Sequence, residues 1–499
     1  MSDKKLSSYV MNCLPGRWTH TAQQKIRETC VQMELSGSVK ETKNVEIKAD
    51  EGLMTCRKTR ERFLQSEVCD ADNLGIFAKQ LAVQNAEGCQ RLFCPIDGSS
   101  LKISDSTGHK GLGPVGTKAS GAKGYIVQNS YLVDQDGIPC GILYQKYFTR
   151  PADVCESQIW AETLERTIRI LSEERLAELA LIIMDRGYDS PEILDWLRTK
   201  SVKIMIRATQ NRKVCSPETE SAKVARETSK PALDYLSEFP QMATMEVSVP
   251  VVLKDKDTPA GTSNVSTTER RTCLLGLKSA PIKIFLRPKR YRDLPKSAGI
   301  DEAKRERLSP ATVVLAEEIN PPDEFAPVRW MLWLNYEVNS PEELQGVIND
   351  YRMRWRIEEF HKIWKSSGTN VEKTQARSAE MIERLARIAA VVASNIARMQ
   401  RFLEANPDTP ATTCFTKKEV ESFKSVDVYY YKGRLAKKHD PHSLAFVMAL
   451  FAKVGGYENG SKTKVGAKML TRGYQQVMNV IAGMRIRDAI LAKMRQTNA

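Results

Sequence analysis

The chain has 499 residues, and its 75 Lys and Arg against 61 Asp and Glu leave a formal net charge of +14. Hydrophobic residues at 41% and charged residues at 27% exclude a wholly disordered chain, and the length predicts about three domains. No apolar stretch reaches the roughly 20 residues of a bilayer span, so we expect no membrane partner. The eleven cysteines form no CxxC pair, which favours reduced thiols and a cytoplasmic location. The positive charge favours a nucleic-acid partner.

The first 90 residues are predicted to be polar and helical, with helical spacing at 21–35 and 55–64. The character changes at Arg91–Asp97, a short apolar run that ends in an acid and indicates a buried strand. Two more strands are expected at 124–133 and 139–148. They are joined by Asp134-Gln-Asp-Gly137, and an Asp-Gly pair between apolar runs predicts a hairpin.

Helical periodicity returns at 155–179, and Leu179–Asp185 follows as a second buried strand that ends in an acid. Ser190 and Pro191 predict the start of a helix that runs to about Lys200, since Ser is a favoured N-cap and Pro a favoured first residue. A third strand is expected at 202–207. This order predicts an α/β fold, a mixed sheet with helices on its faces.

Residues 211–310 are predicted to be an insertion rich in antiparallel strands, placed at 245–253, 272–277 and 282–287. The α/β pattern resumes with strands at 312–316 and 328–334. One long helix is then expected from Ser340 to Ser366. The remainder is predicted to be helical, at 380–402 and 443–495.

One face of that long helix combines cations with a single carboxylate. At 100° per residue, the following side chains fall within an arc of about 80°: Tyr351, Arg354, Glu358, Lys362 and Lys365. Apolar side chains occupy the opposite face. Periodicity alone leaves two interpretations, an ordinary solvated face with i,i+4 ion pairs or a functional stripe.

The spacing of Tyr351, Arg354, Glu358 and Lys365, with gaps of two, three and six residues, matches the Y-(2)-R-(3)-E-(6)-K signature of a branch of DDE transposases. The surrounding segment WRIEEFHKIWK resembles the insertion-sequence-four family of these enzymes. Further segments agree in order with that family, namely Ile183–Asp189, Met205–Arg207 and Ala316–Pro322.

The resemblance implies a ribonuclease H-like (retroviral integrase-type) catalytic core in which Asp97, Asp185 and Glu358 are catalytic and bind two divalent metal ions. Oxygen ligands suit Mg²⁺, with Mn²⁺ as a substitute. Glu359 is the alternative to Glu358. Asp105 is the alternative to Asp97, because Gly98-Ser99-Ser100 replace the threonines that the family shows after its first aspartate.

The resemblance also assigns DNA contacts. Phosphates are expected at Tyr351, Arg354, Lys362, Lys365, Arg207 and Arg212. Trp330 matches a tryptophan that stacks on a flipped base, although a core tryptophan is equally expected. Lys58 and Arg62 are predicted phosphate contacts in the N-terminal helical region, with an ordinary charged helix as the alternative.

The implied function is a cut-and-paste DNA transposase that binds double-stranded DNA at the transposon's terminal inverted repeats, cleaves there through a hairpin intermediate, and joins the 3′ ends to target DNA. Residues 1–90 would bind the DNA end, 91–370 would be catalytic, and 371–499 would form a helical dimerisation region in a homodimeric complex. Two alternatives remain: a metal-dependent nuclease without strand transfer, and a domesticated DNA-binding protein without activity. In a bacterium the protein would associate with the nucleoid.

Overall fold

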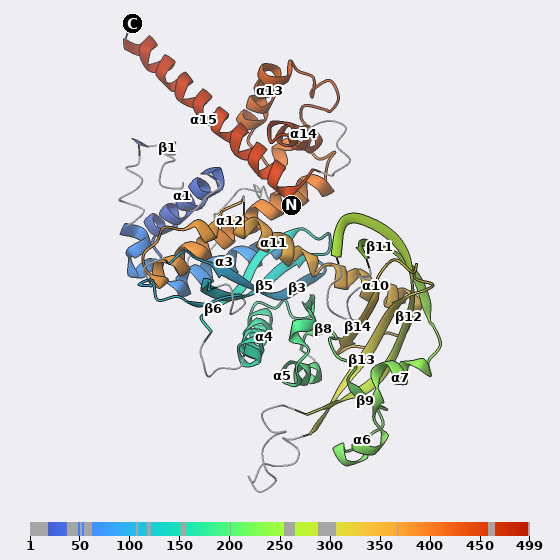
Figure 1. The fold of residues 1–499 in the computed structure, drawn as a ribbon. Helices are drawn as coiled ribbons and strands as arrows, with labels where there is room; N and C mark the ends of the chain where they lie inside the picture. The colour runs from blue at the N-terminus through green and yellow to red at the C-terminus, as the bar shows by residue number, and fades with distance from the viewer. Residues whose placement is uncertain are drawn as a thin grey trace. The chain divides into compact units, whose positions relative to one another are not determined.

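The computed structural model describes residues 18–36, 48–49, 52–53, 62–105, 108–116, 121–150, 156–199, 201–253, 265–287, 306–366, 368–457 and 465–497. The chain divides into two compact units (Figure 1). The first unit comprises Met1–Gln90, Gly98–Ala152 and Arg356–Ala499, and the second comprises Arg91–Asp97 and Asp153–Trp355.

The second unit is built on a mixed sheet. Its strands are β3 (Leu92–Lys102, of which the first residues belong here), β7 (Ala180–Met184), β8 (Lys203–Arg207), β9 (Lys213–Cys215), β10 (Lys230–Pro231), β11 (Ala243–Leu253), β12 (Val265–Leu286), β13 (Arg307–Glu318) and β14 (Arg329–Leu334). Strands β3, β7 and β8 are parallel neighbours, and β8 continues through antiparallel pairs to β14, β13 and β12. The predicted mixed α/β fold is confirmed in this respect.

Helices accompany these strands in the second unit: α4 (Glu156–Glu173), α5 (Pro191–Leu194), α6 (Ala222–Thr228), α7 (Ala232–Ser237) and α10 (Pro341–Arg352). The short 3-10 helices η4 (Arg186–Tyr188) and η5 (Asp195–Arg198) follow β7 and α5. Strand β7 lies between β3 and β8 in the sheet. All five of its residues are apolar, and all five are buried. Parallel strands buried on both faces carry such continuous apolar runs.

The first unit holds a hairpin covered by helices. Strands β5 (Lys123–Asp134) and β6 (Pro139–Phe148) form the predicted hairpin, with Gly137 at a φ of 76° in its turn. Strand β4 (Gly113–Pro114) pairs with β5. Helices α3 (Ala71–Ala86) and α12 (Ala379–Ala405) pack on β6, and α1 (His20–Ser36) packs on α12.

The rest of the first unit is helical, as predicted for the C-terminal part. Its helices are η2 (Glu67–Cys69), α11 (Trp355–Lys365), η7 (Val371–Lys373), η8 (Ala411–Thr413), α13 (Lys417–Tyr431), α14 (Leu444–Val454) and α15 (Ala467–Thr497). Phe423, Phe446 and Phe451 form the centre of a separate apolar core in this region. Val477 and Ile481 of α15 are buried in the same core.

The N-terminal prediction is partly wrong. The region contains a two-stranded pair, β1 (Lys48–Ala49) with β2 (Gly52–Leu53), where only helices were expected. Most of the helix expected at 55–64 lies outside the described residues, and Arg62 begins the part of it that is described.

The helix expected to run from Ser190 to about Lys200 is also wrong in length. Ser190 caps it as predicted, accepting from the backbone N–H of Ile193, but α5 ends at Leu194 and continues only as η5. At this end a distant side chain contacts the helix, since the Ser309 hydroxyl donates to the carbonyl of Leu194.

Strands predicted separately at 272–277 and 282–287 are one strand, β12. Ser279, Ala280 and Pro281 lie between the two predicted strands. In the sheet they continue the pairing with β13, where Pro281 lies opposite Thr312.

The long helix predicted from Ser340 to Ser366 is two helices, α10 and α11, separated at Met353 and Arg354. Residues on the two helices therefore do not form the continuous face derived from a single helical wheel. No glycine or proline marks the break in the sequence.

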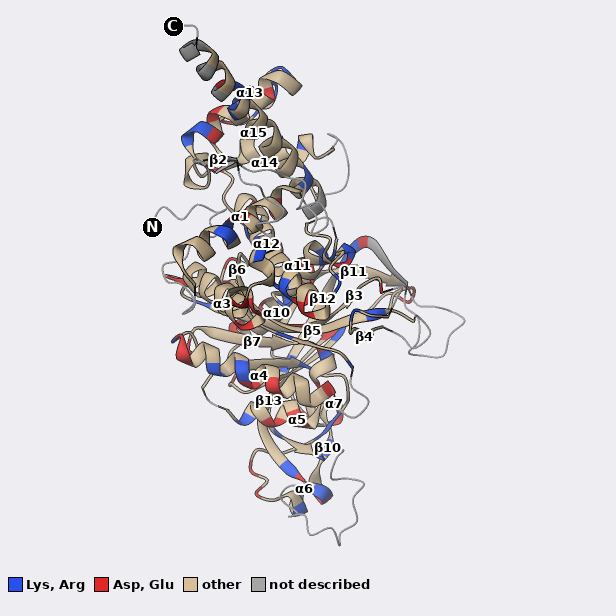
Figure 2. Cartoon of the chain, turned by 90° about the vertical axis from the view of Figure 1, so that its left-hand side faces the viewer, with Lys and Arg blue, Asp and Glu red and all other residues tan. Residues whose placement is uncertain are grey.

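Basic and acidic residues are interspersed over the described elements, α4 among them, so neither sign is confined to one element (Figure 2). No helix in the described part of the chain combines the length and the apolar character needed to cross a bilayer.

Candidate active site

Two of the predicted acids lie at the ends of neighbouring parallel strands. Ile96 of β3 is the register partner of Met184 of β7, and Asp97 and Asp185 are the next residues along each strand. Parallel strands present their carboxyl ends at one edge of a sheet, so both acids reach the same place. The pairing with β7 ends before Asp97, although β3 itself continues to Lys102, further than the predicted strand.

Arg354 joins these two aspartates. Its Nη1 atom lies 3.5 Å from Oδ2 of Asp97 and 3.7 Å from Oδ2 of Asp185. The Arg354 side chain is only 10% exposed, whereas those of Asp97 and Asp185 are 19% and 31% exposed. The break between α10 and α11 contains Arg354. A buried guanidinium beside two carboxylates offsets the repulsion between them.

Asp185 also begins a helix. Its carboxylate accepts from the backbone N–H of Arg186 at 2.6 Å, which makes it the N-cap of η4. Tyr188, on that turn, is buried. Burial raises the pKa of the Tyr188 hydroxyl well above its ordinary value, and the negative charges of Asp97 and Asp185 raise it further. The phenol therefore stays protonated.

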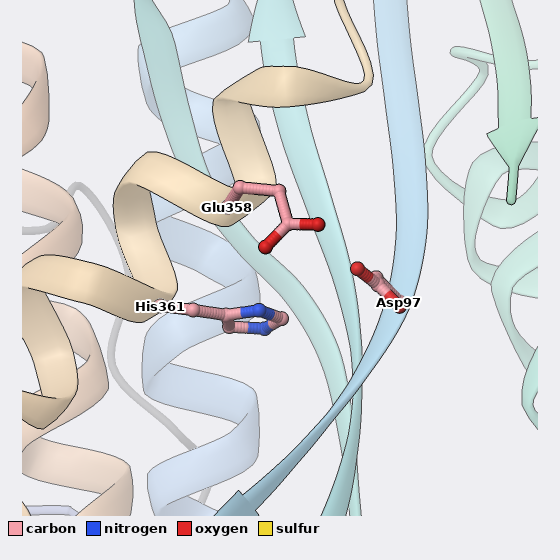
Figure 3. A group of neighbouring side chains, drawn as sticks. All are labelled: Asp97, Glu358 and His361. Atoms are coloured by element: carbon pink, nitrogen blue, oxygen red, sulfur yellow. The ribbon is translucent and has the colours of Figure 1, made fainter. Parts of the chain in front are cut away.

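Glu358 lies in the first turn of α11. Ligand atoms of Asp97, Glu358 and His361 all lie within 4.8 Å of one another, and Figure 3 shows the two carboxylates and the imidazole ring turned toward a common point. Glu358 and His361 are three residues apart on one helix, which places both on the same face.

His361 was missed by the sequence reasoning. It is 7% exposed, and its Nε2 atom lies 3.1 Å from Nδ2 of Asn129 on β5. Asn129 in turn accepts at its Oδ1 from Nε2 of Gln145 on β6, at 2.7 Å. These buried amides hold one edge of the ring, so the other ring nitrogen is the one that can face the carboxylates. The spacing of Glu358 and His361, a Glu-x-x-His motif on one helix, is the sequence signal that could have identified His361 as a candidate metal ligand.

The alternative acids have other surroundings. Glu359 accepts from Arg356 at 3.2 Å and pairs with Arg401 of α12, so its carboxylate is used in joining two helices. Asp105 follows β3 in a loop. It is not part of the described cluster of Asp97, Glu358 and His361.

The aromatic residues assigned to DNA form their own group. Tyr351 is 5% exposed and contacts the Trp330 ring, with centroids 5.9 Å apart. The guanidinium carbon of Arg207 lies 5.9 Å from the centroid of Tyr351. Burial raises the pKa of Tyr351, and the charge of Arg207 partly opposes the shift. Trp330 is half-buried, whereas its neighbour Trp333 is fully buried in the core.

The basic residues assigned to DNA differ in accessibility. Lys362 is exposed, and Lys365 donates to Ser99 at 3.4 Å and lies 3.8 Å from Glu372. Arg62 is exposed, and Lys58 lies outside the described residues.

Arg212 is largely buried and ion-paired with Asp189, Nε to Oδ1 at 2.5 Å. The Asp189 side chain is fully buried and also accepts from the backbone N–H groups of Thr209 and Gln210. In the structure Arg212 thus anchors the loop after β8, and its contact with DNA stays a prediction.

The model of the transposase DDE domain matches residues 89–396, more than half of the chain. The chain belongs to the DDE transposase family. The transposase's match includes Asp97, Asp185 and Glu358, the two strands that carry the aspartates, and α11. Membership implies nuclease and transposition chemistry on a DNA substrate.

DDE transposases generally use divalent metal ions, and the residues of this transposase fit such an ion. Asp97 and Glu358 supply carboxylate oxygens, the ligands that Mg²⁺ and Mn²⁺ prefer, and His361 supplies a nitrogen that Mn²⁺ and other transition metals accept. Asp185, at the same edge of the sheet as Asp97, is held by Arg186 and Arg354.

Proposed function

We propose that this transposase is a cut-and-paste enzyme of the insertion-sequence-four family, similar to the transposon-five transposase. It binds the terminal inverted repeats of its transposon, cleaves at their ends through a hairpin intermediate, and joins the 3′ ends to target DNA. The observation that carries the proposal is the in-register placement of Asp97 and Asp185 at one sheet edge, with Glu358 beside Asp97.

Asp97, Asp185 and Glu358 are proposed to hold two Mg²⁺ ions, with Mn²⁺ as a substitute. Two such ions supply activation of an attacking oxygen and neutralisation of the charge on the leaving oxygen. His361 would orient Glu358 or complete the ligand set, since Asn129 fixes its ring from behind. Before an ion arrives, Arg354 supplies the positive charge between the aspartates.

Substrate contacts are proposed around these acids. Lys362 and Lys365 follow Glu358 on α11 and would bind phosphates of the transposon end, as would Arg207, Arg212, Arg354 and Tyr351. Trp330 is half-buried beside Tyr351, which supports a stacking role for its exposed part. Lys58 and Arg62 would contact the end through the N-terminal region.

A homodimeric complex is proposed through the C-terminal region. Ile486, Ile490 and Met494 of α15 are 53%, 52% and 55% exposed. They recur at every fourth residue and therefore form one apolar stripe. A second copy of α15 would remove that stripe from water.

The test uses the full-length protein, Mg²⁺, a linear DNA that carries the transposon's ends and a target plasmid. Excision, hairpin ends and insertion into the plasmid are expected. Excision without insertion would favour a metal-dependent nuclease, and binding of the ends without any cleavage would favour a domesticated DNA-binding protein. Either result would overturn the proposal.

A further inference from the structure

Helix α13 ends in an exposed apolar and aromatic patch that none of the roles above uses. Val428, Tyr429 and Tyr430 are 64%, 81% and 52% exposed. The rings of Tyr429 and Tyr430 lie edge to face, with centroids 4.9 Å apart. Tyrosines with this much accessible ring surface are available for stacking on a partner.

The chain that follows these tyrosines is strongly basic. Residues 428–439 contain no Asp or Glu, and four cations lie exposed there: Lys432, Arg434, Lys437 and Lys438. Within the described part of the chain, no ion pair is found for any of the four. On the same helix, by contrast, Lys424 pairs with Glu421 at 3.0 Å. The patch therefore carries about four unneutralised positive charges.

This basic segment is held in a fixed conformation. The Asp427 carboxylate is fully buried and accepts from the backbone N–H groups of Leu435 and Ala436, at 3.2 and 3.0 Å. The N–H of Gly433 donates to the Asp427 carbonyl at 3.2 Å, and Gly433 has a φ of 68°. Leu435 and Ala436 also pack on the core around Phe423. A surface ordered before binding loses little conformational entropy when a partner arrives.

We propose that Tyr429, Tyr430, Lys432, Arg434, Lys437 and Lys438 form a second DNA-binding surface, here called the α13 surface, which is separate from the catalytic residues. This proposal depends on the proposed function in one respect, the choice of DNA and not RNA as the nucleic acid. The cations contact phosphates and the tyrosines stack on bases exposed where a duplex is opened or kinked.

Charge decides between DNA and a second copy of this chain. A symmetric contact of the α13 surface with itself would bring two clusters of about four positive charges together, which is unfavourable. The stripe on α15, which contains Ile486, Ile490 and Met494, is apolar, and contact with a second copy would remove it from water. The α13 surface therefore suits an anionic partner.

The test measures binding of the full-length protein without Mg²⁺ to two probes that lack transposon ends. One is a fully paired random duplex, and the other is the same duplex with a central run of mismatches. Lys437→Ala/Lys438→Ala should weaken both complexes and reduce the slope of log affinity against log salt by about two. Tyr429→Ala/Tyr430→Ala should remove the preference for the mismatched probe, roughly tenfold, and leave the salt slope unchanged.

Lys417→Ala/Lys418→Ala is the matched control, since it removes two exposed lysines from the start of the same helix. Its salt slope should equal that of the wild-type protein. Equal effects of both lysine pairs, unchanged binding in the surface variants, or a change in self-association by sedimentation would each overturn the proposal. These measurements do not depend on cleavage or strand transfer. The binding results can therefore be interpreted even if the proposed function is wrong.

Discussion

At the residue scale, the acidic residues of the site differ in which positively charged side chains lie beside their carboxylates. Asp97 and Asp185 share the guanidinium of Arg354, Glu359 pairs with Arg356 and Arg401, and Glu358 lies beside Asp97. Two adjacent glutamates on one helix thus have different surroundings. A carboxylate already paired in a helix contact is a poor metal ligand, because binding an ion would break that pair.

Exchanging each of these glutamates for glutamine should separate the two roles. Glu358→Gln is expected to lower cleavage by about 10³-fold or more while end binding is retained, because a ligand of the reacting ions is lost. Glu359→Gln should retain cleavage and lower the unfolding temperature by a few degrees. Gel assays of cleavage and binding, with thermal unfolding, check both. The assignment is wrong if Glu359→Gln is the variant that loses cleavage.

Arg354 should compete with metal ions for Asp97 and Asp185. Arg354→Gln is expected to bind Mn²⁺ several-fold more tightly, since a buried cation next to the ligands repels the incoming ion. Titration calorimetry with MnCl₂ and no DNA measures this. Arg352→Gln, an exposed neighbour, should bind Mn²⁺ as the wild-type protein does. Weaker binding by Arg354→Gln would show instead that the guanidinium arranges the carboxylates for the ion.

At the element scale, a buried ion pair joins the long strands β12 and β13. The two terminal nitrogens of Arg271, Nη1 and Nη2, donate to the Glu318 carboxylate, and the side chains are 12% and 2% exposed. Glu318 also accepts from the N–H of Val328 at 3.0 Å. The bonds from Arg271 lower the pKa of Glu318, although burial opposes the shift.

Glu318→Gln should lower the free energy of unfolding of the wild-type protein by about 3 kcal/mol, because it leaves Arg271 buried without its counter-ion. The lowered pKa means that this stabilisation is fully present above the unfolded pKa of about 4.3 and is lost as the pH falls through the lower folded value. Urea unfolding at pH 7 and below pH 4 measures the difference.

Glu317→Gln is the control, because Glu317 pairs with Arg329 at the surface and should contribute less than about 1 kcal/mol. A difference between wild type and Glu318→Gln that grows as the pH falls would contradict the assigned direction.

At the scale of the whole molecule, the C-terminal helices carry two exposed surfaces that differ in character. The α13 surface is basic, whereas Ile486, Ile490 and Met494 form an apolar stripe on α15. Val477 and Ile481, earlier on α15, are buried in the core of their own chain and are not available to a partner. The exposed stripe begins five residues later.

Ile490→Glu should therefore weaken self-association by about tenfold or more, since it would bury an unpaired charge at the contact. Sedimentation velocity over a range of protein concentrations measures the shift. Asp488→Asn, on the opposite side of α15, should leave the association unchanged. A wild-type protein that stays monomeric at all concentrations in the presence of end DNA would contradict the proposed dimer.

The sequence by itself determined the elements that depend on neighbouring residues. The Asp-Gly turn, the apolar runs that end near Asp97 and at Asp185, and the cap at Ser190 all rest on contacts within a few positions. The identity of the family also followed from local spacing around Glu358, and the match over residues 89–396 confirms that it is a DDE transposase.

Only the tertiary structure decided how the site's side chains are turned. Arg354 faces two aspartates because α10 and α11 separate at that point, and no local signal marks the break. His361 is held by Asn129, 232 positions away in the sequence, and the carbonyl of Leu194, the last residue of α5, accepts from Ser309, 115 positions away. Helical periodicity describes one element at a time. Hydrogen bonds and ion pairs between distant elements form only when the sheet and helices are assembled. These contacts fix the positions of the side chains in the site.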